Sequence, residues 1–262
     1  MDLMLEGKSV FVAAASKGLG KAVALQYAKE GAKVTIASRS LDRLVEARND
    51  IRERTGVEVS MIEMDASKGE DVSHAIRTAA ATADGLDVLV TNAGGPRGGF
   101  FSDMEDADWT QGFELSLLST IRMIREALPF MKSAGGGRIV NLTSVSIKQP
   151  IDGLILSNVF RAGVYALTKS LATELAESGI LVNTVAPGRI GTDRIAELDA
   201  KKAADRGRTV EDIRAEAERL IPLGRAGTPE EFARHAVFYG SFANTYVTGQ
   251  ALLVDGGMVK GL

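Results

Sequence analysis

A glycine-rich turn near the N-terminus is the stretch whose residue types most clearly predict chemistry. The apolar run at residues 10–15 precedes a turn at residues 16–20 with the sequence Ser-Lys-Gly-Leu-Gly, and apolar residues at helical spacing follow. A strand, turn and helix in this order aim free N–H groups and the positive end of a helix at one point. We therefore predict a cradle for the pyrophosphate of a dinucleotide. The alternative is a tight turn without a ligand.

The end of the second predicted strand indicates which dinucleotide is bound. In such sites an Asp or Glu about twenty residues beyond the glycine turn binds the ribose 2′-hydroxyl of NAD, whereas an arginine accommodates the 2′-phosphate of NADP. The strand at residues 33–38 leads into Arg39, and no acid is present there. Arg39 can place two donors on a phosphate, and Ser38 and Lys17 can add to them. The sequence therefore favours NADP(H) over NAD(H).

Strands that alternate with helices must position these residues. Strands are expected at residues 10–15, 33–38, 58–63, 86–91, 138–142, 180–186 and 251–254. Helices are expected after the glycine turn and at residues 41–55, 69–83, 103–133, 156–177 and 228–242, with Pro129 kinking or terminating its helix. Continuous apolar strands that alternate with helices indicate a parallel sheet covered on both faces. We predict one doubly wound, Rossmann-like α/β domain of about seven strands, with ligands at the carboxyl ends of the strands.

Composition excludes several classes of protein. The 262 residues are 45% hydrophobic and 25% charged, which suits one domain with a substantial core. A formal net charge of −3 gives no general attraction to nucleic acid or anionic membranes. With no cysteine and only His74 and His235, no metal site is predicted. No leader peptide and no run of about 18 apolar residues is present, so a cytoplasmic protein acting on a small molecule is expected.

The glycine turn resembles that of the short-chain dehydrogenase/reductase family, whose loop has the form T-G-x-x-x-G-x-G. Gly18 and Gly20 match this form, whereas Ala13 and Ala14 replace its threonine and first glycine. Ala14 is expected to tolerate a positive φ poorly. Further motifs match in the family's order over almost the whole chain, most like the 3-oxoacyl-[acyl-carrier-protein] reductases. The resemblance implies an NAD(P)-binding domain over residues 1–262.

The same resemblance implies a set of cofactor-binding residues. An Asp-Ala pair after the third strand resembles the family's adenine-binding position, and an Asn-Ala-Gly segment after the fourth resembles its N-N-A-G signature beside the ribose. A Pro-Gly segment after residues 180–186 resembles the one that holds the nicotinamide carboxamide. The set comprises Ala14, Ser16, Lys17, Gly18, Leu19, Gly20, Ser38, Arg39, Asp65, Ala66, Asn92, Ala93, Gly94, Arg161, Pro187, Gly188, Ile190 and Thr192.

The sequence departs from the family at its catalytic residues. The family uses an Asn-Ser-Tyr-Lys tetrad for acid–base chemistry beside a hydride donor. Ser144 matches the serine, but Ser157 and Arg161 stand at the tyrosine and lysine positions, and Ser116 stands at the asparagine position. These four residues are the predicted catalytic set. Arg161 keeps its charge and cannot shuttle protons as lysine does, yet it can donate to the ribose or bind a carboxylate, phosphate or developing alkoxide.

A Tyr-x-x-x-Lys pattern does occur elsewhere in the sequence. Tyr165 and Lys169 lie eight residues beyond the expected positions. Moving the pattern into register would displace every later match to the family. We therefore interpret Tyr165 as a packing residue, with a catalytic role as the alternative.

Three functions remain open. The first is NADP(H)-dependent reduction of a ketone or 3-oxoacyl-like carbonyl by a divergent Ser/Ser/Arg site, on a substrate whose anionic group meets Arg161 and Arg97. The second is a non-catalytic NADP(H)-binding sensor or assembly subunit, which the three replacements favour. The third, a lyase or dehydratase, lacks an evident general base.

The resemblance also bears on the charged segment at residues 193–219 and on assembly. In the family such an insertion forms a mobile lid over the substrate, here expected at about 189–223, while a solvated helical excursion is the alternative. Family members form dimers or tetramers, which implies a homo-oligomer through helices that include residues 117–128 and 164–175.

Overall fold

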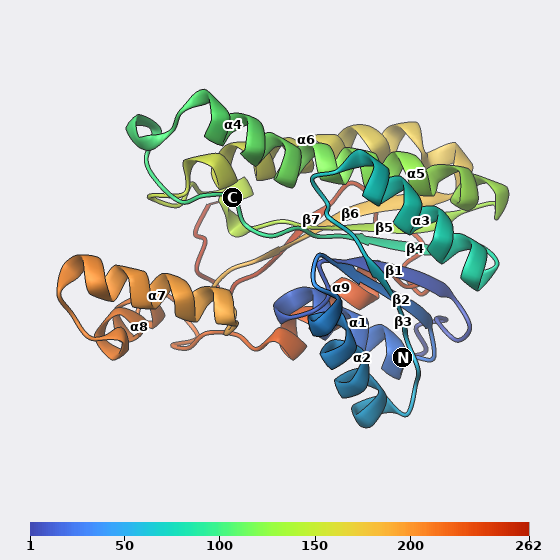
Figure 1. Cartoon of the computed structure of the whole chain (residues 1–262), viewed down its shortest axis with the longest axis horizontal. Coiled ribbons are helices and arrows are strands. Elements are labelled where there is room, and N and C mark those ends of the chain that lie inside the picture. The colour runs from blue at the N-terminus through green and yellow to red at the C-terminus, as the bar shows by residue number, and fades with distance from the viewer. Residues whose placement is uncertain (262) are drawn as a thin grey trace.

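The sheet that positions the predicted site is fully parallel. The computed structural model describes residues 1–261, and its seven strands lie in the order β3-β2-β1-β4-β5-β6-β7 (Figure 1). Strand order reverses between β1 and β4, and ligands of such sheets bind beside the carboxyl ends of the strands at this point. The predicted single, doubly wound Rossmann-like domain is confirmed. The strands are β1 (Ser9–Ala13), β2 (Lys33–Ser38), β3 (Ser60–Glu63), β4 (Val88–Thr91), β5 (Gly137–Leu142), β6 (Ile180–Pro187) and β7 (Ala251–Val254).

Helices cover both faces of this sheet. Figure 1 shows α3, α4, α5 and α6 on one side and α1, α2 and α9 on the other. Their bounds are α1 (Gly18–Lys29), α2 (Leu41–Thr55), α3 (Gly69–Ala83), α4 (Asp106–Phe113), α5 (Ser119–Ser133), α6 (Ile155–Glu174), α7 (Asp193–Arg206), α8 (Val210–Glu218) and α9 (Pro229–Tyr239). Short turns η1 (Phe101–Asp103), η2 (Glu114–Leu118), η3 (Val145–Ile147) and η4 (Ala176–Ser178) complete the structure.

The central strand β1 shows why the strands are apolar throughout. All five of its residues are buried. Val10 and Val12 join the core that includes Phe232 of α9, whereas Phe11 and Ala13 join the core on the opposite face. Because successive side chains of a strand point to opposite faces, a sheet covered on both sides needs apolar residues at every position. The continuous apolar runs in the sequence follow from this burial.

The predicted helix at residues 103–133 is confirmed from residue 106 onward, because the chain is helical without a break over residues 106–133. Within it, residues 114–118 form the π-helical turn η2 between α4 and α5, with the wider i→i+5 hydrogen bonding of a π-helix, and the sequence did not predict this turn. Helix α5 continues four residues beyond Pro129, so that proline does not terminate it. β3 and β4 each begin two residues later than predicted. α9 begins at Pro229, because Thr228 caps it with a reciprocal capping box to Glu231.

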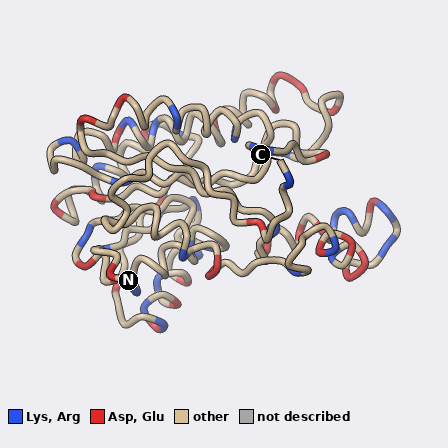
Figure 2. Tube along the Cα trace, turned by 180° about the vertical axis from the view of Figure 1, so that it is seen from behind, with Lys and Arg blue, Asp and Glu red and all other residues tan. Residues whose placement is uncertain are grey.

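Helices α7 and α8 form a charged excursion between β6 and α9, here called the α7–α8 segment (residues 193–218). It projects from the body of the protein in Figure 1, and Figure 2 shows acidic and basic residues along it. Its anchor is a largely buried ion pair between Arg189, in the loop after β6, and Asp199 of α7. Among residues 1–261, no helix combines the length and apolar character needed to cross a membrane.

Candidate functional site

A cavity of about 510 Å³ opens at the carboxyl ends of the central strands. Of the predicted cofactor residues, all but Gly20 line it. Those lining residues are Ala14, Ser16, Lys17, Gly18, Leu19, Ser38, Arg39, Asp65, Ala66, Asn92, Ala93, Gly94, Arg161, Pro187, Gly188, Ile190 and Thr192. Residues from six separate parts of the chain thus converge on one space of the size that small-molecule sites have.

The glycine turn forms one wall of this cavity. Ala14 has φ +48° and Gly18 has φ +57°, both in the left-handed region. A Cβ at Gly20 would lie 2.4 Å from the carbonyl oxygen of Ala14, so only glycine lets α1 start this close to β1. Gly20 therefore allows α1 to pack closely against the end of β1, although Gly20 itself does not line the cavity. Lys17, the residue before α1, makes no side-chain cap, which leaves the first N–H groups of the helix directed at the cavity.

Basic side chains gather at the β2 end of the cavity. Lys17, Arg39 and Arg43 all line it, and the hydroxyl of Ser38 is buried there with no hydrogen-bond partner in the described part of the chain. Asp65 lies close by. Partial burial acts to raise the pKa of Asp65, but hydrogen bonds from the Ser67 hydroxyl and amide, together with the charge of Arg39, hold this pKa below its usual range. A cluster of cations beside an unsatisfied hydroxyl suits a bound phosphate group.

Arg161 lies at the opposite end, on α6. Its Nη1 donates to the carbonyl oxygen of Leu142 at 2.9 Å, where β5 ends. Within residues 1–261 no carboxylate forms an ion pair with it, and burial lowers its pKa to about 10. It is therefore a cation at neutral pH that faces the cavity without an acidic partner. Such a group attracts an anion or a developing negative charge.

A buried polar network fixes α6 against the sheet. The Thr91 hydroxyl donates to Asn141 Oδ1 at 2.6 Å, and Asn141 Nδ2 donates to the Thr168 hydroxyl at 2.9 Å. The hydroxyls of Thr168 and Thr184 are also 2.9 Å apart. These residues belong to β4, β5, β6 and α6. The helix that carries Arg161 is thus tied to three strands below the cavity.

The three predicted catalytic serines do not line the cavity. The Ser144 hydroxyl accepts a hydrogen bond from the Ser146 amide at 3.2 Å and caps η3. Ser157 is half-buried in the first turn of α6, four residues before Arg161, and so lies on the same helix face. Ser116 is buried in the π-helical turn η2, and its hydroxyl has no partner. The structure groups Arg161, but not these serines, with the predicted cofactor residues.

Tyr165 and Lys169 also lie outside the cavity lining. Lys169 is exposed, with its Nζ 5.8 Å from the centre of the Tyr165 ring. Arg97, which the sequence offered as a contact for a substrate anion, is held by the Asp108 carboxylate and by the carbonyl oxygen of Asp103. The positive charge of Arg97 is therefore already partnered.

Eleven further lining residues belong to neither the predicted catalytic set nor the predicted cofactor set, although four of them fall within the predicted lid at about 189–223. They are Ser40, Arg43, Met64, Gly95, Leu115, Leu142, Thr143, Asp193, Arg194, Ile195 and Glu197. Arg43 lies in the first turn of α2, four residues after Arg39, and this spacing could have indicated that both arginines face the cavity. Arg194 and Glu197 reach the cavity only because α7 folds back over it. No local pattern marks them.

Comparison with known proteins identifies the chain. A family model described as enoyl-(acyl carrier protein) reductase matches residues 13–259. The chain belongs to the short-chain dehydrogenase/reductase family. The resemblance seen in the sequence is thereby confirmed, and with it membership of a family of oxidoreductases.

Similar short-chain dehydrogenases/reductases cover nearly the full length. The chain is 35% identical to 3-oxoacyl-[acyl-carrier-protein] reductase FabG of Aquifex aeolicus over 98% of this chain and 100% of that protein. It is 36% identical to 3beta-hydroxysteroid dehydrogenase 1 of Eggerthella lenta, over 97% and 94%. Among solved structures, L-sorbose reductase from Gluconobacter frateurii, complexed with NADPH and L-sorbose, superposes with a TM-score of 0.95 at 33% identity, covering 100% of both chains.

The residues around the cavity fit the dinucleotide that this family implies. A Cβ at Gly20 would fill the space that lets the turn close, and the buried Ser38 hydroxyl lacks a partner. Lys17, Arg39 and Arg43 supply positive charge beside it. Arg39 and Arg43 would hold a phosphate on the ribose, and the N–H groups at the start of α1 would hold the pyrophosphate.

Proposed function

We propose that the chain is an NADP(H)-dependent reductase that converts a carbonyl compound to an alcohol, using Ser144, Ser157 and Arg161. One observation carries this proposal. Arg161 faces the same cavity as the residues suited to the dinucleotide and, among residues 1–261, has only the Leu142 carbonyl as a hydrogen-bond partner. Arg39 and Arg43, with no acid at the end of β2, support NADPH over NADH. NADPH also occupies the similar L-sorbose reductase structure.

The chemistry requires charge stabilisation at the carbonyl oxygen. NADPH, when bound, would supply a hydride to the carbonyl carbon. Arg161 would stabilise the negative charge that develops on the carbonyl oxygen. Ser157 lies one helical turn before Arg161, outside the cavity lining, and its hydroxyl would be the second donor to this oxygen. Water supplies the proton, since neither arginine nor serine has a pKa suited to proton transfer near neutrality.

The charge of Arg161 also favours an anionic substrate. A carboxylate or phosphate beside the carbonyl would give the guanidinium the acidic partner that it lacks within residues 1–261. Arginine binds such groups through two parallel hydrogen bonds, which would fix the carbonyl relative to the dinucleotide. The substrate class we propose is therefore a ketone that carries an anionic group.

Two features of this family complete the proposal. The α7–α8 segment serves as the lid over the substrate, since four of its residues line the cavity across from the glycine turn. The protein assembles as a homodimer or homotetramer through α5 and α6. Phe113, at the end of α4, and Val159, in the second turn of α6, are exposed apolar residues that such an interface would cover.

A second candidate function is NADP(H) binding without catalysis. The observation that favours it is the position of the serine hydroxyls, because none of the three serines lines the cavity. In that case the protein would bind the dinucleotide as a sensor or as a subunit of an assembly. It would not oxidise NADPH with any carbonyl substrate.

Parallel titrations of NADPH and NADH, followed by nicotinamide fluorescence, test the proposal. We expect NADPH to bind more tightly than NADH, and Arg39→Ala to remove this preference. A screen of ketones with and without a carboxylate or phosphate then measures NADPH oxidation. Turnover that is lost in Arg161→Ala, while NADPH affinity is kept, supports the reductase. Binding without turnover across the screen supports the second function, and binding of neither dinucleotide refutes both.

A further inference from the structure

Glu197 places a carboxylate within the proposed cofactor cavity. It lies on α7 and lines the cavity opposite the glycine turn. Its Oε1 is 3.7 Å from Nζ of Lys17, which precedes α1. Its Oε2 is 3.8 Å from Nη1 of Arg194, which also lines the cavity. A single carboxylate is thus shared between two of the cations that an entering phosphate would use.

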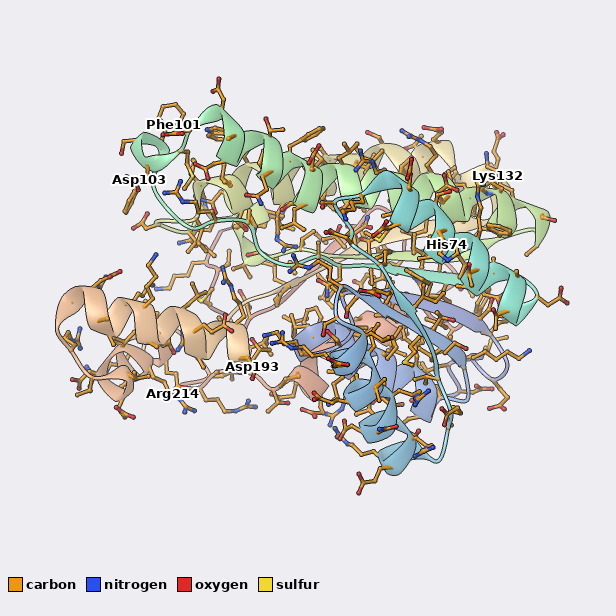
Figure 3. All side chains as sticks on the ribbon, viewed as in Figure 1. His74, Phe101, Asp103, Lys132, Asp193 and Arg214 are labelled. Carbon is orange, nitrogen blue, oxygen red and sulfur yellow. The ribbon has the colours of Figure 1, made fainter. Side chains whose placement is uncertain are left out.

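The surrounding structure holds Glu197 in this position. The start of α7 lies against the glycine turn, since a Cβ at Gly18 would be 3.8 Å from Cγ2 of Thr192. Figure 3 labels Asp193 at this end of α7, next to the body of the protein, and Arg214 farther out on α8. Two residues beyond Glu197 on the same helix, Asp199 pairs with Arg189. Because α7 is fixed on both sides of Glu197, its carboxylate remains close to the glycine turn.

A carboxylate at this place opposes the binding of phosphate groups in two ways. It partly neutralises Lys17 and Arg194, and it repels the negative charge of the ligand directly. The side chains of Lys17 and Glu197 are 46% and 58% exposed, so water and salt weaken both effects. The consequence is a modest loss of affinity, and a weaker complex dissociates faster.

We propose that Glu197 sets the affinity of the cavity for its phosphate-bearing cofactor, by competing with the cofactor phosphates for Lys17 and Arg194. This inference rests on the proposed binding of NADPH. It assigns to Glu197 a role that no motif marks. The ion pair between Glu197 and Lys17 also joins the α7–α8 segment to the glycine turn. When Lys17 leaves Glu197 and binds a phosphate, this ion pair breaks and the segment is held less firmly against the turn.

The test compares NADPH affinity in the wild type and in Glu197→Gln, which keeps the shape of the side chain and removes its charge. We expect the dissociation constant to fall about two- to fivefold, the range that half-exposed ion pairs allow. Glu211→Gln is the matched control. Glu211 is exposed on α8 and outside the cavity lining, so this variant changes the net charge equally and should leave the affinity unchanged.

A Lys17→Met background identifies the contact responsible. With Lys17 absent, Glu197→Gln should tighten NADPH binding by a smaller factor than in the wild type, because one of the two contested cations is gone. The difference between wild type and Glu197→Gln should also shrink at about 1 M salt.

The outcomes separate this inference from the proposed function. Wild-type binding of NADPH together with an unchanged or weaker affinity in Glu197→Gln refutes the role of Glu197 and leaves the proposed function standing. An equal gain in Glu211→Gln also refutes it, since net charge would then be the cause. If none of the variants binds NADPH, the proposed function and this inference fall together.

Discussion

Replacement of Arg161 by methionine should make the protein more stable while it removes the proposed catalytic charge. Burial lowers the pKa of Arg161 from the usual arginine range to about 10. At about 1.4 kcal/mol for each pKa unit, this corresponds to roughly 3 kcal/mol of unfavourable charge burial. Below pH 10 the folded chain holds the buried cation, so the penalty is fully present at neutral pH and declines only as the pH rises above about 10 toward the usual arginine range.

Arg161→Met removes this penalty, but part of the stability gained is offset because the hydrogen bond to Leu142 is also lost. The carbonyl oxygen of Leu142 accepts from Arg161 at 2.9 Å, and its loss costs about 1–2 kcal/mol. Methionine fills much of the volume of the arginine stem and adapts to irregular spaces. The net expectation is a gain of about 1–2 kcal/mol. For a chain of this size, this raises the midpoint of thermal unfolding by about 2–8 °C.

The assay is thermal unfolding near neutral pH, followed by circular dichroism, on the protein without added ligands. Arg125→Met is the control, because Arg125 is exposed on α5 and its loss changes the net charge equally without removing a buried cation. It should leave the midpoint unchanged within about 1 °C. A lower midpoint for Arg161→Met would refute the reasoning, since it would mean that the guanidinium stabilises the fold. A functional arginine that costs stability is the pattern expected where activity and stability conflict.

Two further substitutions test strain and burial elsewhere in the structure. Ala14→Gly should raise the free energy of unfolding by about 0.5–1 kcal/mol, measured by denaturant titration, because φ +48° is unfavourable for alanine but not for glycine. A lower free energy of unfolding in this variant would contradict the strain assigned to the turn. Tyr27→Phe should raise the free energy of unfolding by about 1 kcal/mol, because the Tyr27 hydroxyl is fully buried without a hydrogen-bond partner among residues 1–261 and burial raises its pKa. A loss of stability in this variant would show that the hydroxyl does have a hydrogen-bond partner.

Most of the proposed cofactor site could be predicted from the sequence. Glycine turns, strand ends and the residue after β2 are local features, and parallel topology brings strand ends to one edge of the sheet. The predicted residues from Ala14 to Thr192 therefore line one cavity. Ala14 was also expected to be strained, and its φ of +48° confirms this. Three points remain predictions: the preference for NADPH, the catalytic activity and the oligomeric state.

The reacting end of the site was less predictable. Matching to family positions indicated three serines beside Arg161, yet none of these serines lines the cavity. The hydroxyl of Ser144 caps its own turn, and Ser116 lies in a π-helical turn that helical periodicity does not reveal. Position along a motif fixes which strand or helix carries a residue. The direction of its side chain depends on which hydrogen-bond partners the surrounding residues offer.

The sequence alone determined the alternation of strands and helices, the glycine turn and the charge at the end of β2, because each depends on residues close together in the chain. Tertiary structure decided which distant charges meet. Glu197 faces Lys17 across 180 positions of the sequence, and Arg161 donates to Leu142 from another element. Such contacts arise from the packing of α6 and α7 against the ends of the strands. That packing is set by the burial of many side chains together, which no local pattern records.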